Sequence, residues 1–140
     1  MAVERKANKR FYLVQLSYTA DAWRALVDGE AKGTRVERNR YRAVKELVES
    51  FDGCFGELSF PSVSPPGPYE KFVSFGEYDI VAILAFPDEI QAAAFAMAIS
   101  ASGTVKAFKT TPLLPMADGE TAMAVAKEKT VKVRYRGPGA

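Results

Sequence analysis

The chain has 140 residues, of which 48% are hydrophobic and 26% are charged, and its formal net charge is +2. This length and balance are typical of one soluble globular domain, and so small a net charge does not by itself imply a nucleic-acid or membrane partner. With no histidine and a single cysteine, Cys54, the sequence excludes an internal disulfide, histidine-ligated haem and metal centres that use histidine.

The chain begins with a predicted strand. Residues 11–18, FYLVQLSY, alternate in the manner of a strand that has two different faces. Thr19 is placed to cap a helical turn that follows. Two glycines interrupt residues 28–35, so we expect the helical structure to stop there and to resume near Val36.

The resumed helix is amphipathic, because apolar side chains recur at three- and four-residue steps. We expect Gly53 to end it as a left-handed cap. A second strand is predicted over about residues 54–60, with Cys54 as a small buried side chain. Four prolines then exclude regular structure from a loop over about residues 59–75. We expect this proline-rich loop to lie against the protein or a neighbouring subunit.

The third strand is predicted over about residues 77–86. Asp88 follows it and is suited to cap an alanine-rich helix, which we expect Gly103 to end. A fourth strand is predicted over about residues 104–111. Beyond it the pattern indicates a short helix over residues 120–129.

The C-terminal segment TVKVRYR, residues 130–136, alternates apolar and basic side chains. This alternation predicts a half-exposed edge strand. Basic residues that alternate with a tyrosine are also suited to bind nucleic acid. The arginine-rich segment 35–42 is similarly suited to bind an anion. Solvated surfaces explain both segments equally well, and we expect no nucleic-acid partner.

The order strand–helix–strand occurs twice, which is the pattern of the ferredoxin-like βαββαβ fold. We therefore predict a single α+β domain over residues 1–140 with an antiparallel sheet. The ferredoxin-like core is expected over about residues 10–111. Residues 112–140 form a C-terminal extension that adds a helix and the edge strand.

The third strand is apolar on both of its faces. Its side chains alternate between Ile80, Ala82 and Leu84 on one face and Val81, Ile83 and Ala85 on the other. Because the two helices of this fold cover only one face of the sheet, something else must cover the second. We predict that a second copy does so and forms a dimeric α/β barrel. In the alternative, the proline-rich loop and the C-terminal extension cover the face within one chain.

The segment GEYD, residues 76–79, precedes the apolar strand, the alanine-rich helix and the strand GTVKAF. In this order the chain resembles the GYD domain family, which is named for a Gly-Tyr-Asp signature that Glu77 interrupts here. The resemblance covers about residues 10–111. It implies a ferredoxin-like fold that assembles through its open sheet face, but it implies no particular reaction.

Asp79 and Tyr78 are the candidate catalytic residues. A carboxylate at the mouth of an apolar barrel is suited to act as a general base if its surroundings raise its pKa. Two structural interpretations compete with this one. Asp79 would either accept hydrogen bonds from loop amides and fix the turn, or form a salt bridge at the subunit contact.

Polar side chains on the predicted strands are candidates for ligand binding. An exposed edge or a polar interface contact explains each of them as well, and a single bulge would change the face on which they lie. The candidates are Gln15, Ser17, Glu57 and Lys106, together with Lys109.

The sequence contains no phosphate-binding glycine loop, cysteine metal cluster or nucleophile elbow, so we predict neither a metal nor a cofactor. No apolar run reaches the roughly 18 residues that span a bilayer, and we expect a cytoplasmic protein without a membrane partner. The preferred function is a GYD-type homo-oligomer, a dimer or larger, that binds a small molecule or serves an accessory role. The alternatives are a cofactor-independent enzyme for a small apolar substrate, and an interaction module of a larger assembly.

Overall fold

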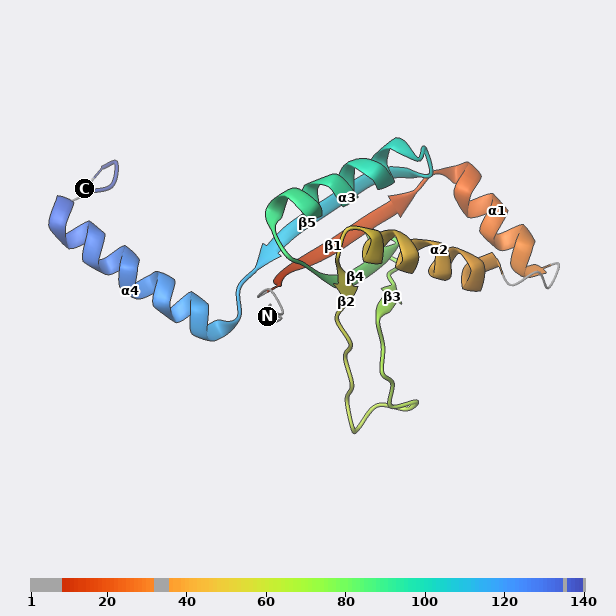
Figure 1. Ribbon diagram of the computed structural model, residues 1–140, viewed down its shortest axis with the longest axis horizontal. Helices are drawn as coiled ribbons and strands as arrows, with labels where there is room; N and C mark the ends of the chain where they lie inside the picture. The colour runs from red at the N-terminus through yellow and green to blue at the C-terminus, as the bar shows by residue number, and fades with distance from the viewer. Residues whose placement is uncertain (1–8, 32–35, 135, 140) are drawn as a thin grey trace, which may run out of the picture.

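The computed structural model describes residues 9–31, 36–134 and 136–139 (Figure 1). Within these residues the chain forms five strands and four helices. They are, in chain order, β1 (Arg10–Tyr18), α1 (Ala20–Ala31), α2 (Val36–Ser50), β2 (Cys54–Phe55), β3 (Lys71–Val73), β4 (Ile80–Phe86), α3 (Glu89–Ala101), β5 (Val105–Leu113) and α4 (Met116–Val133).

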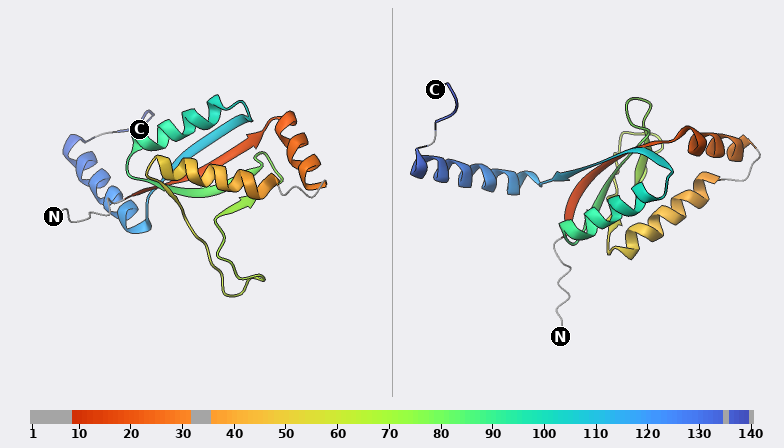
Figure 2. Two further views of the ribbon diagram at one scale, coloured as in Figure 1. Left: turned by 45° about the vertical axis from the view of Figure 1, so that its right-hand side comes forward. Right: turned by 90° about the horizontal axis from the view of Figure 1, so that it is seen from above.

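The strands form one antiparallel sheet in the order β2-β4-β1-β5, and β3 also pairs with β4. The long strands β4 and β5 thus lie on either side of β1. The helices α2 and α3 lie on the same face of the sheet, and no helix in the described part of the chain lies over the other face (Figure 2). The prediction of a ferredoxin-like α+β fold is confirmed.

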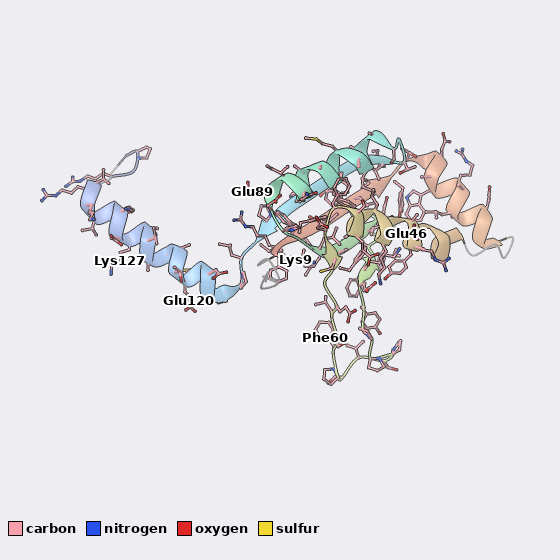
Figure 3. All side chains as sticks on the ribbon, viewed as in Figure 1. Lys9, Glu46, Phe60, Glu89, Glu120 and Lys127 are labelled. Carbon is pink, nitrogen blue, oxygen red and sulfur yellow. The ribbon has the colours of Figure 1, made fainter. Side chains whose placement is uncertain are left out.

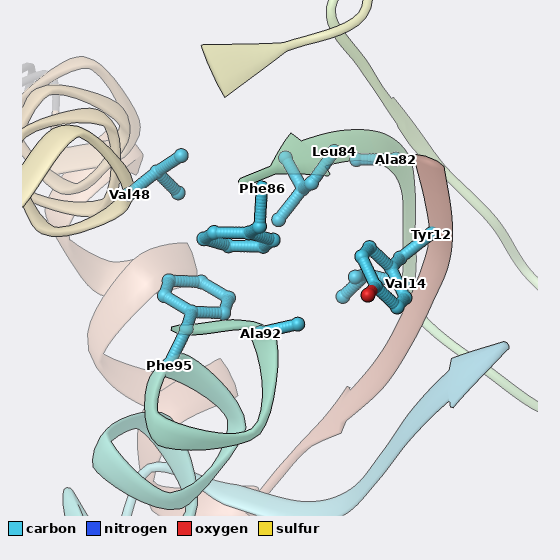
Figure 4. Packing of buried hydrophobic residues seen from close by; sticks show 8 residues of the cluster. All are labelled: Tyr12, Val14, Val48, Ala82, Leu84, Phe86, Ala92 and Phe95. Carbon is cyan, nitrogen blue, oxygen red and sulfur yellow. The ribbon is translucent and has the colours of Figure 1, made fainter. Parts of the chain in front are cut away.

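The hydrophobic core fills the space between the sheet and the helices α2 and α3. Strand register sets its composition, because residues paired directly across an antiparallel ladder share a face. Tyr12 pairs with Leu84, and Val14 pairs with Ala82. All four side chains are buried and point toward the helices, as Figure 4 shows.

Aromatic contacts join the two layers. Phe86 at the end of β4 packs on Phe95 of α3, with ring centroids 5.4 Å apart, and on Tyr12 of β1 at 6.1 Å. Val48 brings α2 into the same cluster and is completely buried. The face of the sheet that carries Tyr12 is therefore covered by the protein's own helices.

Local capping signals predict the starts of α1 and α3 correctly. The Asp88 carboxylate accepts a hydrogen bond from the backbone N–H of Gln91 at 2.9 Å, and the Thr19 hydroxyl accepts one from Ala22 at 3.1 Å. The left-handed residue after α2 is Asp52, with φ of 60°, rather than the predicted Gly53. Gly53 is needed for space instead, because it lies directly against the ring of Phe86.

The second predicted strand is shorter than expected, and the segment after it adds a strand that the sequence did not suggest. Regular pairing stops at Phe55 and resumes in β3, Lys71–Val73. Between them an arm, residues 56–70, projects beyond the sheet edge, and Phe60 lies out on it (Figures 1 and 3). Residues 59–68 are all exposed, so this segment does not lie against the body of the protein. Its prolines lack the N–H groups that a continued ladder requires.

Cys54 was predicted to be buried, but it is exposed. It pairs with Ala85, whose side chain belongs to the face without helices. The strand begins at the outer edge of the sheet, where none of the described helices or strands covers the thiol.

The predicted edge strand at residues 130–136 is wrong. The helix α4 begins at Met116 and continues to Val133, and Arg134 ends it in the left-handed conformation. Alanine, lysine and glutamate favour the helix, and Lys132 pairs with Glu128 one turn earlier at 3.6 Å. Tyr135 lies outside the described residues, as does Arg35 of the arginine-rich segment.

The helix α4 stands apart from the sheet, and its side chains project from it on all sides (Figure 3). None of its residues is buried, and its apolar side chains Met123 and Val131 are 66% and 67% exposed. The extension therefore does not cover the helix-free face in this chain. Among the described residues, no helix is long and apolar enough to cross a membrane.

Substituting Gly53 tests the packing at the end of α2. A Cβ atom at this position would lie 2.6 Å from the Phe86 ring and 2.9 Å from the carbonyl oxygen of Ala85. Since Phe86 is fully buried, we expect Gly53→Ala to lower the free energy of unfolding by about 1–3 kcal/mol, measured by urea denaturation. Gly76→Ala is the control, because nothing lies within 4 Å of the added atom. Equal stabilities of the two variants would contradict this account.

Candidate functional site

Asp79 lies just before β4, where the chain enters the sheet beside the end of β1. Its backbone N–H donates to the carbonyl oxygen of Leu16 at 2.8 Å. Its carboxylate oxygen Oδ2 accepts a hydrogen bond from the backbone N–H of Tyr18 at 2.9 Å. The same oxygen accepts a second bond from the indole N–H of Trp23 at 3.1 Å.

These bonds connect three elements that are distant in the sequence. Asp79 belongs to the approach to β4, Tyr18 ends β1 and Trp23 lies in the first turns of α1. The rings of Tyr18 and Trp23 pack edge to face, with centroids 5.5 Å apart. Asp79 thus fixes the angle at which α1 leaves the sheet, and the geometry favours the structural interpretation of this residue. Tyr78 is half-buried beside it.

The four predicted ligand-binding residues are not brought together. Gln15 and Ser17 lie on the helix-free face of β1, and the Ser17 hydroxyl donates to the backbone carbonyl of Glu77 at 3.0 Å. Glu57 is exposed at the base of the arm. Lys106 is exposed at a bulge, where the pairing of β1 with β5 shifts by one residue.

A narrow apolar groove lies between the sheet and the helices α2 and α3. Its free volume is about 50 Å³. It is lined by apolar side chains from the sheet and from both helices, including Val14, Ala82, Val44, Phe95 and Phe108. An apolar lining with few polar groups at its edge is the character of a small-molecule site, and this volume has room for a group of only a few atoms.

Lys71 is the only charged residue among the described residues that line this groove. Its register opposite Ala82 places it on the helix side of the sheet. Its ammonium nitrogen lies 4.7 Å from the centroid of the Tyr41 ring, a cation–π contact. The groove is thus apolar inside and carries a positive charge at its border.

A second, wider hollow of about 390 Å³ adjoins Lys71 on the outside. Tyr41, Tyr69 and Glu70 line it with Lys71. Lys45 reaches the same place from α2, with its ammonium 3.6 Å from Glu70 Oε1 and 5.8 Å from the Tyr41 ring centroid. We call this group, Tyr41, Lys45, Glu70 and Lys71, the lysine mouth of the groove.

No sequence pattern predicted the lysine mouth. Its members come from one face of α2, from β3, a three-residue strand inside the proline-rich segment, and from Glu70 directly before that strand. Lys71 and Glu70 are separated from Tyr41 by about thirty residues of chain, and only the pairing of β3 with β4 brings them together. The alternating pattern of EKFV is too short to predict that pairing.

Another cavity, of about 630 Å³, lies where β5 leads into α4. Arg10 and Glu89 at its wall form an ion pair of 3.1 Å with each other. Burial raises the pKa of the nearby Tyr12 phenol, as does the negative charge of Glu89, while Arg10 opposes this shift. Its apolar wall includes Phe11 and Leu113, which pair on the helix-free face. This cavity is therefore continuous with the open face of the sheet.

Metal ligands are not gathered anywhere in the part of the chain that the structure describes. No group of three or more histidine, cysteine, aspartate or glutamate residues is placed to hold an ion there.

Comparison with known protein families identifies one relationship. The family model described as GYD domain matches residues 70–123, which confirms the predicted resemblance. The match begins at Glu70 of the lysine mouth, spans β3, β4, α3 and β5, and enters α4. It thus extends past the predicted limit near residue 111, whereas the predicted N-terminal part of the resemblance lies outside it. Neither the curated proteins nor the solved structures contain a match to this chain.

Replacing Asp79 tests its structural role. Asp79→Ala leaves the N–H groups of Tyr18 and Trp23 without their acceptor, so we expect the free energy of unfolding to fall by about 2–4 kcal/mol. Urea denaturation followed by the fluorescence of Trp23, the sole tryptophan, measures this. The emission of the folded variant is expected to shift as the indole loses its partner. Glu57→Ala, at an exposed position outside the helices, is the control, and an equally small effect in both variants would contradict the assignment.

Proposed function

We propose that this GYD-domain protein is a cytoplasmic homodimer that binds a small apolar molecule in the groove between its sheet and helices. The observation that carries the proposal is the apolar sheet face without helices. The groove and its lysine mouth supply the binding site. The dimer supports the site because it would fix the sheet on which the groove is built.

The helix-free face is apolar across three neighbouring strands. Direct cross-strand pairs bring Phe11, Leu13, Val81, Ile83 and Leu113 onto it. β3 adds Phe72, which pairs with Val81. Phe11 and Phe72 remain 41% and 40% exposed.

A second copy suits this face better than solvent does. Burial of apolar surface contributes about 25 cal/mol per Å², and stable interfaces usually bury at least about 1,000 Å² in total. A three-strand face closing symmetrically on its own copy has the size for such an interface. Lys109, which pairs with Gln15 on this face, lies toward the β5 edge and is suited to the rim.

The alternative of a cofactor-independent enzyme has weaker support. Asp79 already accepts two hydrogen bonds from the protein, and it does not line the groove, the hollow or the cavity beside α4. A substrate bound in any of these three spaces would therefore not contact the Asp79 carboxylate. The geometry therefore favours binding over proton transfer.

A charge on the helix-free face tests the dimer. Val81→Lys places an ammonium group in the centre of the proposed interface, so we expect at least a hundredfold rise in the dimer dissociation constant, about 2.7 kcal/mol. Sedimentation equilibrium measures the change. Ile90→Lys is the control, because Ile90 is 79% exposed on α3, away from this face. A wild-type monomer at micromolar concentration would contradict the dimer, as would a dimer of unchanged affinity in Val81→Lys.

Filling the groove tests the binding site. Ala82→Ile adds three carbon atoms to a buried position on the groove wall. We expect the affinity for a small neutral alcohol, 2-methylpropan-1-ol, to fall at least tenfold, measured by isothermal titration, because the added atoms occupy the apolar space. Ala93→Ile, on the exposed side of α3, is the control. Equal affinities for the alcohol in both variants would place its binding elsewhere and contradict the site.

A further inference from the structure

The helix α4 carries a surface for a second copy of this chain. We propose that α4 pairs with α4 of another copy in antiparallel orientation. This surface is separate from the helix-free face of the sheet, so the inference goes beyond the proposed function and does not depend on it. Three features of the helix carry it.

The first feature is that α4 has no packed face within the described chain. The helix has 18 residues, Met116–Val133, and none of them is buried (Figure 3). Most of the stability of a helix in a protein comes from packing one of its faces, and propensity alone supports an isolated helix of this size poorly. A partner for one face of α4 is therefore expected.

The second feature is a heptad spacing along one side of α4. Apolar and small side chains recur there at alternating steps of three and four residues, the spacing of the a and d positions of a coiled coil. We call this set the seam, and it consists of Met116, Gly119, Met123, Ala126, Thr130 and Val133. Its three largest apolar side chains are between 66% and 73% exposed, so the seam is open to a partner.

The composition of the seam suits a second helix. Gly119 and Ala126 allow another helix to approach closely, and the flexible side chain of Met123 can fill the remaining gaps. The Thr130 hydroxyl donates to the carbonyl oxygen of Ala126 at 2.6 Å. Because its hydrogen bond lies within its own helix, Thr130 can enter the seam without leaving a polar group unsatisfied.

The third feature is charge complementarity, which selects a second copy as the partner and sets its direction. The charged residues in the first half of α4 are both acidic, Asp118 and Glu120. The second half and the cap are mainly basic, with Lys127, Lys129, Lys132 and Arg134 against Glu128. An antiparallel pair lays the acidic half of each helix against the basic half of the other, whereas a parallel pair would bring the two basic ends together.

Antiparallel alignment about the helix centre brings every seam residue opposite another. Met116 lies opposite the partner's Val133, and Met123 lies opposite the partner's Ala126. Beside the seam, Glu120 comes next to the partner's Lys127, and two-fold symmetry repeats this pair. Within one helix Glu120 and Lys127 lie about two turns apart and do not meet, so only association can join them.

The pair is modest by itself. A seam of this length is much smaller than the interfaces of stable complexes, which bury at least about 1,000 Å², so it does not replace the sheet dimer at micromolar concentration. In an assembly that also uses the helix-free face, the covalent link between the two surfaces raises their effective concentration.

Disulfide exchange between two single-cysteine chains tests the pair and its direction. Both chains carry Cys54→Ser, which removes the exposed native thiol. One chain also carries Met116→Cys and the other Val133→Cys, and the two are mixed at high concentration in a glutathione redox buffer. Antiparallel pairing places the two new thiols opposite each other. We therefore expect the mixed disulfide to exceed either like-with-like disulfide at least tenfold, measured by mass spectrometry of the intact chains.

A charge in the seam provides the second measurement. Met123→Lys in both chains places ammonium groups beside the partner's Lys127, so we expect the mixed disulfide to fall at least tenfold. Thr121→Lys is the matched control, because it adds the same side chain on the opposite side of α4 and should leave the yield unchanged. Lysine favours helices, so both variants retain α4, which circular dichroism checks.

An exchange of charges between the chains tests the alignment. Glu120→Lys in the Met116→Cys chain faces Lys127 of the other chain, so we expect the mixed disulfide to fall about threefold, the size of an exposed ion-pair effect. Lys127→Glu in the Val133→Cys chain should restore the yield. Failure of this second substitution to restore it would contradict the alignment.

The outcomes separate this inference from the proposed function. A statistical mixture of disulfides, or an excess of the like-with-like products, overturns the antiparallel pair. Equal yields in Met123→Lys and Thr121→Lys overturn it as well. The disulfides report on α4 alone, so they remain interpretable if the sheet dimer fails its own test with Val81→Lys.

Discussion

The pairing of β1 between β4 and β5 is the constraint on which the rest of the structure depends. Its register fixes which side chains of three strands share a face. Because α2 and α3 occupy one face, the apolar residues of the other have no partner within the described chain (Figure 2). The core, the groove and the open surface are thus three consequences of one alignment.

The fold was predictable because its signals are local and periodic. The apolar run of β4, the Asp88 cap and the repeated strand–helix–strand order each depend on neighbouring residues. The position of Asp79 at the mouth of β4 followed from the same run. The hydrogen-bond donors to the Asp79 carboxylate were not predictable, because Trp23 and Tyr18 approach it only after the sheet has formed.

Other features depend on contacts that no local pattern records. β3 forms because it pairs with β4, and this pairing brings Lys71 of the lysine mouth next to Tyr41. At the C-terminus a local pattern predicted a strand that does not form. The alternation of valine and lysine in residues 130–133 fits a strand only if a neighbouring strand is present. Without one, helix propensity and the pair of Glu128 with Lys132 decide the conformation.

The helix α4 gives the molecule an elongated outline, since it continues away from the sheet where β5 ends (Figure 1). An elongated particle has a larger frictional coefficient than a sphere of equal mass. Its elution volume in gel filtration will therefore overstate its mass, and a single subunit will elute as if it were larger. Light scattering or sedimentation equilibrium, which do not depend on shape, are the appropriate methods for counting its subunits.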